Sequence, residues 1–222
     1  MTLGHFDFAR YAAKVQPIPP DVYAAEERAE RRRKAEDHWR KVLPDAFALA
    51  TGRELVGRVS DRRLLEASTW NASKGNLVLL GRTGGGKSTM AAFAMKAHLV
   101  AMSQSWRGGE FDYERAIERV RWVSCRRLGE LVRGGFAFAA QLDTLVESAK
   151  HATLLVFDDL GQDGAKDAVN SILNDRYEAR GAVTIATSGL SEEGLVGQYG
   201  QDVVRRLLQA GGKPATVIGG AS

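Results

Sequence analysis

The stretch Gly81-Arg-Thr-Gly-Gly-Gly86-Lys87-Ser88 decides the fold of this 222-residue chain. It follows the apolar run Asn76–Leu80 and precedes the helix-like segment Thr89–Val100. Two glycines separated by four residues and followed by Lys-Ser form the phosphate-binding pattern known as the P-loop. The glycines let backbone N–H groups point at phosphate oxygens, and the following helix N-terminus adds a favourable partial charge. We therefore expect a nucleoside triphosphate to bind here.

Each position of this loop has an expected role. The Lys87 ammonium would reach the β- and γ-phosphates, and the Ser88 hydroxyl would be a ligand of Mg2+. The residues expected to bind the nucleotide are Gly81, Thr83, Gly84, Gly85, Gly86, Lys87, Ser88 and Thr89. The alternative is a merely glycine-rich turn, which the strand and helix patterns on either side disfavour.

A second acidic element lies downstream, where the apolar run Leu154–Phe157 ends in Asp158 and Asp159. This is the pattern of a Walker B element, and it places Asp158 to bind Mg2+ through water. Asp159 is a candidate catalytic residue, because a neighbouring carboxylate can orient and polarise the attacking water. The alternative is an acidic strand end that caps the next helix. The expected cofactors are ATP and Mg2+.

A third polar strand end follows in Val183-Thr-Ile-Ala-Thr187-Ser188-Gly189. Small hydroxyl residues beside the acidic strand could contact the γ-phosphate or the lytic water. Thr187 and Ser188 are the candidate catalytic residues of this element. A strand end with a turn explains both residues almost as well.

The apolar runs alternate with helix-like stretches from residue 76 onward. The expected strands are Leu77–Leu80, Trp122-Val123, Leu154–Phe157 and Val183–Ala186. The runs are continuous rather than alternating, which is typical of parallel strands buried on both faces. The predicted fold is α/β, with a parallel sheet flanked by helices. A further helical segment is expected over residues 45–68.

Composition restricts the class of protein. No apolar run approaches the roughly 20 residues that cross a membrane, and Met1–Arg10 lacks the pattern of a signal peptide. Cys125 is the single cysteine, which excludes an internal disulfide and a four-cysteine zinc site. We expect a cytoplasmic protein with no membrane partner. The net charge of +4 is only a weak indication of a polyanionic partner.

The chain is predicted to divide into residues 1–45, a helical arm that docks a partner, and residues 46–222, the ATPase domain. The arm begins with Phe6, Phe8 and Tyr11 and a proline-rich linker at 17–20. Residues 21–41 are dense in opposite charges three and four apart, which favours a helix. This helix is either a solvated face that touches nothing or a docking surface.

Residues 74–212 resemble the AAA+ ATPases of the DnaC-like replicative-helicase loaders and the related IstB-type transposition helpers. The motifs that carry the resemblance are Gly75-Asn-Leu-Val-Leu-Leu-Gly-Arg-Thr-Gly-Gly-Gly-Lys-Ser-Thr89, Leu154-Leu-Val-Phe-Asp-Asp-Leu-Gly161, Asn174-Asp-Arg-Tyr177 and Gly181-Ala-Val-Thr-Ile-Ala-Thr-Ser-Gly-Leu-Ser191. The combination is far more specific than a P-loop alone.

The resemblance implies an arginine finger in Gly200-Gln-Asp-Val-Val-Arg205-Arg206-Leu207, with Arg206 acting on the γ-phosphate of a neighbouring subunit. A basic surface helix is the alternative. Two departures from the family stand out, since Gly189 occupies the position of its usual asparagine and no C-terminal lid domain is evident. Both departures favour a slow ATPase that works as a switch.

The resemblance also implies single-stranded DNA binding by a helical insert near Cys125–Ala140, with Arg126, Arg127, Arg133 and Phe136 as candidate contacts. The alternative is a core phenylalanine among ordinary surface charges. The leading functional hypothesis is a loader that places a hexameric replicative DNA helicase on single-stranded DNA, through self-association or a partner-templated oligomer. An IstB-type helper on duplex DNA is the first alternative, and a small-molecule phosphotransferase is the second.

Overall fold

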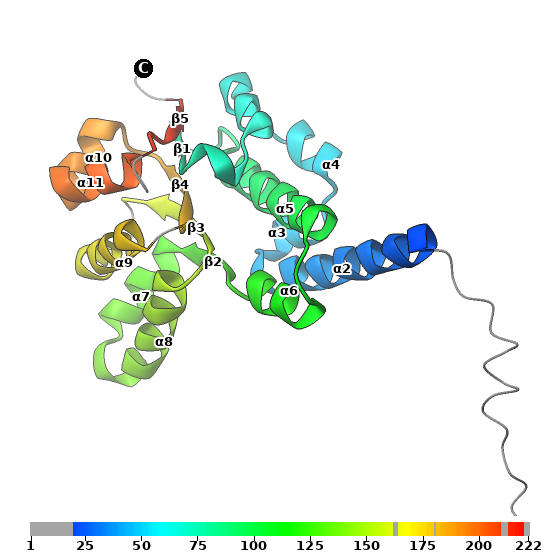
Figure 1. The fold of residues 1–222 in the computed structure, drawn as a ribbon. Coiled ribbons are helices and arrows are strands. Elements are labelled where there is room, and N and C mark those ends of the chain that lie inside the picture. The colour runs from blue at the N-terminus through cyan, green and yellow to red at the C-terminus, as the bar shows by residue number, and fades with distance from the viewer. Residues whose placement is uncertain (1–19, 162–163, 180, 210–212, 220–222) are drawn as a thin grey trace, which may run out of the picture.

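The computed structural model describes residues 20–161, 164–179, 181–209 and 213–219. Within them, parallel strands form one five-stranded sheet in the order β2-β3-β4-β1-β5. The strands are β1 (Leu77–Leu80), β2 (Val120–Ser124), β3 (Leu154–Leu160), β4 (Val183–Ser188) and β5 (Thr216–Ile218). Helices cover both faces of the sheet (Figure 1). The predicted α/β class is confirmed.

Two groups of helices enclose the sheet. The first consists of α2 (Pro20–Val42), α3 (Asp45–Ala48), α4 (Gly52–Gly57), the 3-10 helices η1 (Arg62–Thr69) and η2 (Ala72–Lys74), α5 (Lys87–Ser105) and α6 (Glu110–Ile117). The second consists of α7 (Cys125–Arg133), the 3-10 helix η3 (Gly135–Phe138), α8 (Ala139–Lys150), α9 (Lys166–Glu178), α10 (Glu192–Tyr199) and α11 (Gln201–Leu208). None of the helices in the described ranges has the length and apolar character needed to span a bilayer.

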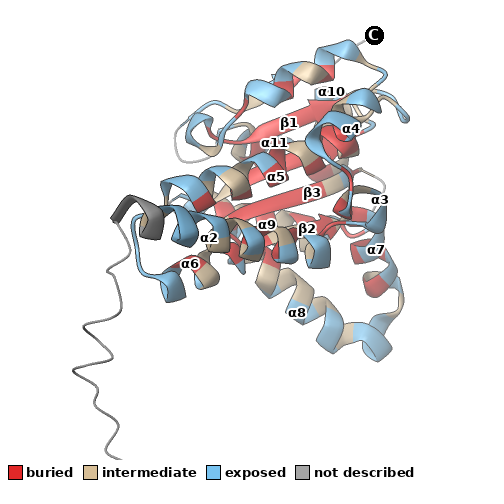
Figure 2. Ribbon diagram, turned by 90° about the vertical axis from the view of Figure 1, so that its right-hand side faces the viewer, coloured by how far each residue is buried: buried red, intermediate tan, exposed pale blue. Residues whose placement is uncertain are grey.

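Side chains of one strand serve both layers. Leu77 and Leu79 of β1 pack into the cluster beneath α5, whereas Val78 and Leu80 pack into the cluster beneath α9 and α11. Successive side chains of a strand point to opposite faces, so both faces of β1 must be apolar. Figure 2 shows β1 and β3 as buried strands between helices. This double burial explains the continuous apolar runs in the sequence.

The four strands predicted from the apolar runs are present, and β5 is an addition. Its three residues pair with β1 at one edge of the sheet, and Val217 in its middle is 42% exposed. A strand this short, half open to solvent, leaves no apolar run that marks it in the sequence.

The segment 45–68 differs from its prediction as one helical stretch, because it is divided into α3, α4 and η1. The Thr51 hydroxyl accepts a hydrogen bond from the Glu54 N–H, and the Glu54 carboxylate accepts one from the Thr51 N–H. This capping box begins a new helix at α4. Asp61 then caps η1 by accepting from the Arg63 N–H. Local caps therefore interrupt the periodic apolar pattern.

The C-terminal half of α2 packs on the sheet domain. Ala35 and Trp39 lie four apart on one face of the helix, Leu43 follows four residues later just beyond its end, and all three are at most 7% exposed. Lys34 forms ion pairs with two glutamates of α6. The interpretation of this helix as a face that touches nothing is therefore wrong. The boundary at residue 45 stays a prediction, and the aromatic and proline-rich features of residues 1–19 lie outside the described residues.

His38 connects α2 to the sheet and predicts a pH-dependent stability. Its Nε2 lies 2.9 Å from the carbonyl oxygen of Val120. Burial lowers the pKa of His38 below its ordinary value, and the Val120 carbonyl offsets only part of this effect. The unfolded chain therefore takes up the proton at a higher pH than the folded chain. The contribution of His38 to the free energy of unfolding therefore falls as the pH decreases below about 6.5, by at most about 1.4 kcal/mol per pH unit for one proton.

We expect His38→Gln, which keeps a side-chain donor for Val120, to flatten this pH dependence. Urea unfolding followed by circular dichroism between about pH 5 and pH 7.5 measures the slope. His98, whose pKa burial also lowers, would supply the remaining slope. His151→Gln is the matched control, since that side chain is 77% exposed. An unchanged slope in His38→Gln would contradict the assignment.

Candidate nucleotide site

The predicted site residues meet at the carboxyl end of three adjacent strands. The P-loop follows β1, Asp158 and Asp159 lie near the end of β3, and Thr187 and Ser188 end β4. β4 lies between β1 and β3, with Leu80 of β1 opposite Ser188. The carboxyl edge of an open parallel sheet is where ligands bind in this class of fold.

The glycines of the P-loop allow a backbone that other residues would strain. Gly84 has φ 84° and Gly86 has φ 100°, both in the left-handed region. A Cβ at Gly86 would also lie 2.9 Å from the Cα of Val59, closer than such atoms approach. Two separate reasons therefore require glycine at position 86: its left-handed backbone and the close approach of Val59. Thr83 and Gly84 remain exposed, so the loop is open to a phosphate.

Lys87 begins α5 and lies beneath the loop. It is 6% exposed, and its Nζ donates to the carbonyl oxygens of Gly81 at 2.7 Å and Arg82 at 3.0 Å. Burial lowers the pKa of Lys87, while the nearby carboxylates of Asp159 and Asp158 oppose that shift. An ammonium group held inside the loop is suited to bind an anion that enters it.

A contact that the sequence does not predict comes from the segment before the sheet. The Ser60 hydroxyl donates to the carbonyl of Gly84 at 3.1 Å, and the Asp61 N–H donates to the carbonyl of Gly85 at 3.1 Å. Val59 lies against Gly86. The segment 59–61 therefore forms one wall of the P-loop. No motif marks it, because its role depends only on where α4 and η1 place it.

Asp158 is positioned among groups that a metal site would use. The Thr187 hydroxyl donates to its Oδ1 at 2.8 Å, and the Ser88 hydroxyl lies near enough to favour the ionised form of its carboxylate. Burial raises the pKa of Asp158 above its ordinary value despite these two donors. A carboxylate and a hydroxyl that already face each other match the oxygen ligands that Mg2+ prefers.

Asp159 has an unusual backbone conformation. Its φ is 67°, the one positive value among the described non-glycine residues, and the pairing of β3 with β4 is irregular between Phe157 and Leu160. The Thr187 hydroxyl accepts from the Asp159 N–H at 2.9 Å. Such a backbone costs roughly 1–3 kcal/mol and is characteristic of functional sites. Thr187 therefore holds both carboxylate-bearing residues in position, as acceptor for one and donor to the other.

Ser188 differs from Thr187 in its contacts. Its side chain is fully buried, its hydroxyl donates to the carbonyl of Leu160 at 2.8 Å, and it accepts from the Leu190 N–H at 3.0 Å. The first contact joins β4 to β3 and the second belongs to the turn after β4, so both fit the alternative foreseen for this residue, a strand end with a turn. Gly189 follows, and a Cβ there would meet the Thr83 hydroxyl at 3.9 Å. Thr187 is thus the better-placed candidate at this strand end.

Arg206 lies outside this cluster, on α11. Its guanidinium donates to the Asn174 side chain of α9 and lies 5.8 Å from the ring centroid of Tyr177. Arg205 lies 5.9 Å from the same ring and has a 46% exposed side chain. The structure therefore brings both arginines to one aromatic platform. The role of a finger acting on another subunit stays a prediction.

The residues present fit a magnesium-bound nucleoside triphosphate. The site combines an open loop of backbone N–H groups, a buried ammonium, a hydroxyl and a buried carboxylate. The described residues contain no cluster of three or more His, Cys, Asp or Glu side chains that could hold a metal by themselves. A divalent ion here would therefore need phosphate or water oxygens besides Ser88 and Asp158, as Mg2+ commonly does.

The helical insert predicted after the second strand is present as α7, η3 and α8. Phe136 on η3 is 99% exposed, so it is not a core residue. The side chains of Arg126 and Arg127 are 81% and 55% exposed, and both lie within 3.5 Å of Glu130. Arg133 ends α7 and is also exposed. The predicted set therefore lies on the insert between β2 and β3, with its side chains open to solvent.

The sheet order and the site together define the class of protein. The chain has the fold of an α/β P-loop nucleoside triphosphatase. The P-loop follows β1, and β4 separates β1 from the acidic strand β3. The described part of the chain contains no helical lid after α11, where only β5 follows.

No family model and no curated protein matches the chain. It is similar in structure to a DNA replication initiation factor (18% identity, TM-score 0.47). It is also similar to the replication initiator DnaA bound to AMPPCP and single-stranded DNA (17%, 0.47), and to AMPPCP-bound DnaA from Aquifex aeolicus (19%, 0.46). The alignments cover 70% of this chain and 43–44% of those chains. The chain therefore spans less than half the length of these proteins, and a likeness this distant carries no conclusion about function.

Proposed function

We propose that the chain is a slow AAA+ ATPase that binds ATP and Mg2+ and helps to place a hexameric replicative helicase on single-stranded DNA. The observation that carries the nucleotide part is the meeting of Lys87, Ser88, Asp158 and Thr187 at one edge of the sheet. The loader part rests on the motifs that resemble the DnaC-like family and on the exposed aromatic residue of the insert between β2 and β3.

The proposed roles follow from the contacts of each side chain. Lys87 binds phosphate oxygens, and Ser88 and Asp158 hold the metal. Asp159 polarises the attacking water, and Thr187 keeps both carboxylates in place through its hydroxyl. Bound Mg2+ supplies charge neutralisation for the transferred phosphoryl group. Gly189 offers no side chain toward Thr83, which supports slow turnover and a switch rather than a motor.

Replacing each of the two arginines of α11 in turn tests which of them, if either, is the arginine finger. We expect Arg206→Ala to leave ATP affinity unchanged within about twofold and to remove the hydrolysis that depends on assembly, by about 10^3-fold or more for a true finger. Turnover measured against protein concentration, with and without the helicase, gives this result. Arg205→Ala is the matched variant, since Arg205 is the more exposed neighbour on the same ring. If only Arg205→Ala loses the hydrolysis that depends on assembly, the finger is Arg205 and not Arg206.

Phe136 offers a test of the nucleic-acid surface. A fully exposed aromatic ring can stack on a base, which contributes about 1–3 kcal/mol per base. We expect Phe136→Ala to weaken binding of a labelled single-stranded oligonucleotide by roughly 5- to 150-fold in fluorescence anisotropy. Phe111→Ala is the control, because Phe111 is 68% exposed on α6. Equal affinities for wild type and Phe136→Ala would remove Phe136 from the interface.

The loader function is tested by affinity purification with the replicative helicase of the native host. The proposal expects an ATP-sensitive complex that depends on residues 1–45. A variant lacking residues 1–19 tests this dependence while Ala35 and Trp39 stay in the core. ATP-dependent filaments on duplex DNA, with no helicase complex, would instead identify a transposition helper. Phosphate transfer from ATP to a nucleoside or another metabolite would reject both DNA-related functions.

A further inference from the structure

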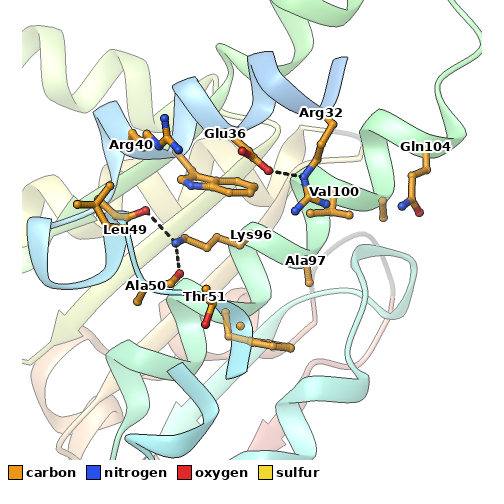
Figure 3. Close-up of a pocket in the computed structure, with 15 residues that line it drawn as sticks. Arg32, Glu36, Arg40, Leu49, Ala50, Thr51, Lys96, Ala97, Val100 and Gln104 are labelled. Atoms are coloured by element: carbon orange, nitrogen blue, oxygen red, sulfur yellow. Dashed lines mark hydrogen bonds and ion pairs between the residues drawn. The ribbon is translucent and has the colours of Figure 1, made fainter. Parts of the chain in front are cut away.

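A groove of about 580 Å3 lies on the α5 side of the molecule, apart from the nucleotide site. It runs between α2, α5 and the segment that joins α3 to α4 (Figure 3). Its apolar lining includes Trp39, Phe93 and Val100, and four charged side chains also border it. Apolar surface of this kind, rimmed by charges, is typical of a binding groove.

The base of the groove is held by Lys96, a buried cation. Its Nζ donates to the carbonyl oxygens of Phe47 at 2.7 Å, Ala48 at 3.0 Å and Ala50 at 2.7 Å. It also lies 5.1 Å from the ring centroid of Trp39. All three ammonium donors therefore have partners and connect α5 to α3 and the segment after it, while the Trp39 ring adds a contact with α2. The groove is preformed, so an occupant would lose little free energy in ordering it.

Leu49 extends the apolar surface at the rim. It is 80% exposed, although its neighbours Ala48 and Ala50 are at most 9% exposed. The Lys96 contacts with residues 48 and 50 keep this segment in place, so Leu49 is presented outward on a fixed backbone. An exposed apolar side chain on a fixed rim suits a broad surface contact better than an enclosed small molecule.

The charges around the groove favour an acidic occupant. Arg32, Arg40 and Lys96 line it against a single carboxylate, Glu36. Glu36 is paired with Arg32 at 2.8 Å, whereas Arg40 is 53% exposed and lies 3.7 Å from Asp37. The lining therefore carries an excess of positive charge, and Arg40 is its most available cation.

We propose that this groove docks an amphipathic helix of a partner protein, with apolar residues against Phe93, Val100 and Leu49 and acidic residues toward Arg40. Helix-in-groove recognition uses an apolar stripe as anchor and flanking charges for orientation. The proposal concerns a surface apart from the nucleotide and insert regions, and it holds whether or not the partner is a helicase.

Two other occupants fit the charges less well. Residues 1–19 of the chain contain Asp7 as their only acidic residue, against the basic Arg10 and Lys14. Their net charge is therefore positive, like that of the groove. A second copy of the chain has a net charge of +4, which disfavours association through a basic groove. Both remain distinguishable outcomes of the experiment below.

Site-specific photo-cross-linking identifies the occupant. A photoreactive amino acid replaces Ala101 or Gln104, which line the groove from α5, in the full-length protein in its native host. We expect both positions to cross-link to one segment of one partner, and that segment to combine apolar helical periodicity with acidic residues. Cross-links to residues 1–19, to a second copy, to a segment without acidic residues or to nothing would each overturn the proposal.

A synthetic peptide of the cross-linked segment then tests the contacts. Leu49→Asp and Arg40→Glu are each expected to weaken peptide binding by at least about tenfold. Reversing the facing glutamate of the peptide to lysine should restore binding to Arg40→Glu. Phe111→Asp, which changes another exposed apolar side chain, is the control and should bind within about twofold of wild type. Full affinity in Leu49→Asp and Arg40→Glu would overturn the proposal even where a cross-link forms.

Discussion

Replacing Lys87 with alanine is expected to abolish ATP turnover and to weaken ATP binding by at least about 30-fold. Removing one partner of a buried charged contact costs about 2–5 kcal/mol, which corresponds to roughly 30-fold to several thousandfold in affinity. Lys87 is the buried cation of the loop, at 6% exposure, and it already donates to two loop carbonyls. Fluorescence titration with a labelled ATP analogue and a phosphate-release assay measure the two effects.

The fold should tolerate this change. The carbonyls of Gly81 and Arg82 belong to a partly open loop, so water can replace the lost donors, and we expect a loss of stability of no more than about 1 kcal/mol. Lys74→Ala is the matched control, because its exposed ammonium also donates to a carbonyl, that of Thr69 at 2.8 Å. Normal ATP binding by Lys87→Ala would refute the nucleotide site itself.

The second large effect is on stability, and it comes from Arg176. This side chain is 3% exposed and joins three elements: its guanidinium donates to the carbonyls of Ala149 and Ala152 and of Val183, and to the Thr184 hydroxyl. Burial lowers the pKa of Arg176 to about 10. We expect Arg176→Ala to lower the free energy of unfolding by about 3–5 kcal/mol, because buried acceptors lose their partners and a void remains.

Urea unfolding followed by circular dichroism measures this loss. Arg176→Lys should recover little of it, since an ammonium cannot reproduce the planar fork that reaches several acceptors at once. Arg127→Ala is the control, as its side chain is 55% exposed, and it should change the stability by less than about 0.5 kcal/mol. A loss below about 1 kcal/mol in Arg176→Ala would show that the surrounding carbonyls find other donors.

Arg176 also explains a motif on which the family resemblance depends. Within Asn174-Asp-Arg-Tyr177, the arginine joins α9 to β4, the asparagine accepts from Arg206, and the tyrosine ring lies beside Arg205 and Arg206. The motif therefore has a structural function that needs no ligand. It also fixes where α11 presents its two arginines, so the same residues position the proposed finger.

How much the sequence predicts depends on how local the physical cause is. The conformation of the glycine-rich loop and its place between β1 and α5 were predictable, because the glycines, Lys87 and Ser88 lie within a few positions of one another. The first four strands were predictable as well, since burial on both faces requires an uninterrupted apolar run. The contacts of Ser188 could not be predicted from the sequence. The chain alone does not show whether a hydroxyl at a strand end faces a ligand or the neighbouring strand and turn.

The sequence by itself determined the glycine-rich loop after β1, the acidic strand end and the α/β class, all of which follow from short-range spacing and periodicity. Only the tertiary structure decided that β4 lies between β1 and β3, which brings Thr187 to Asp158 and Asp159. It likewise decided that segment 59–61 forms a wall of the P-loop and that Lys96 holds the base of a groove. These features join residues far apart in the chain, and such pairings are selected by the packing of the whole core rather than by any local pattern.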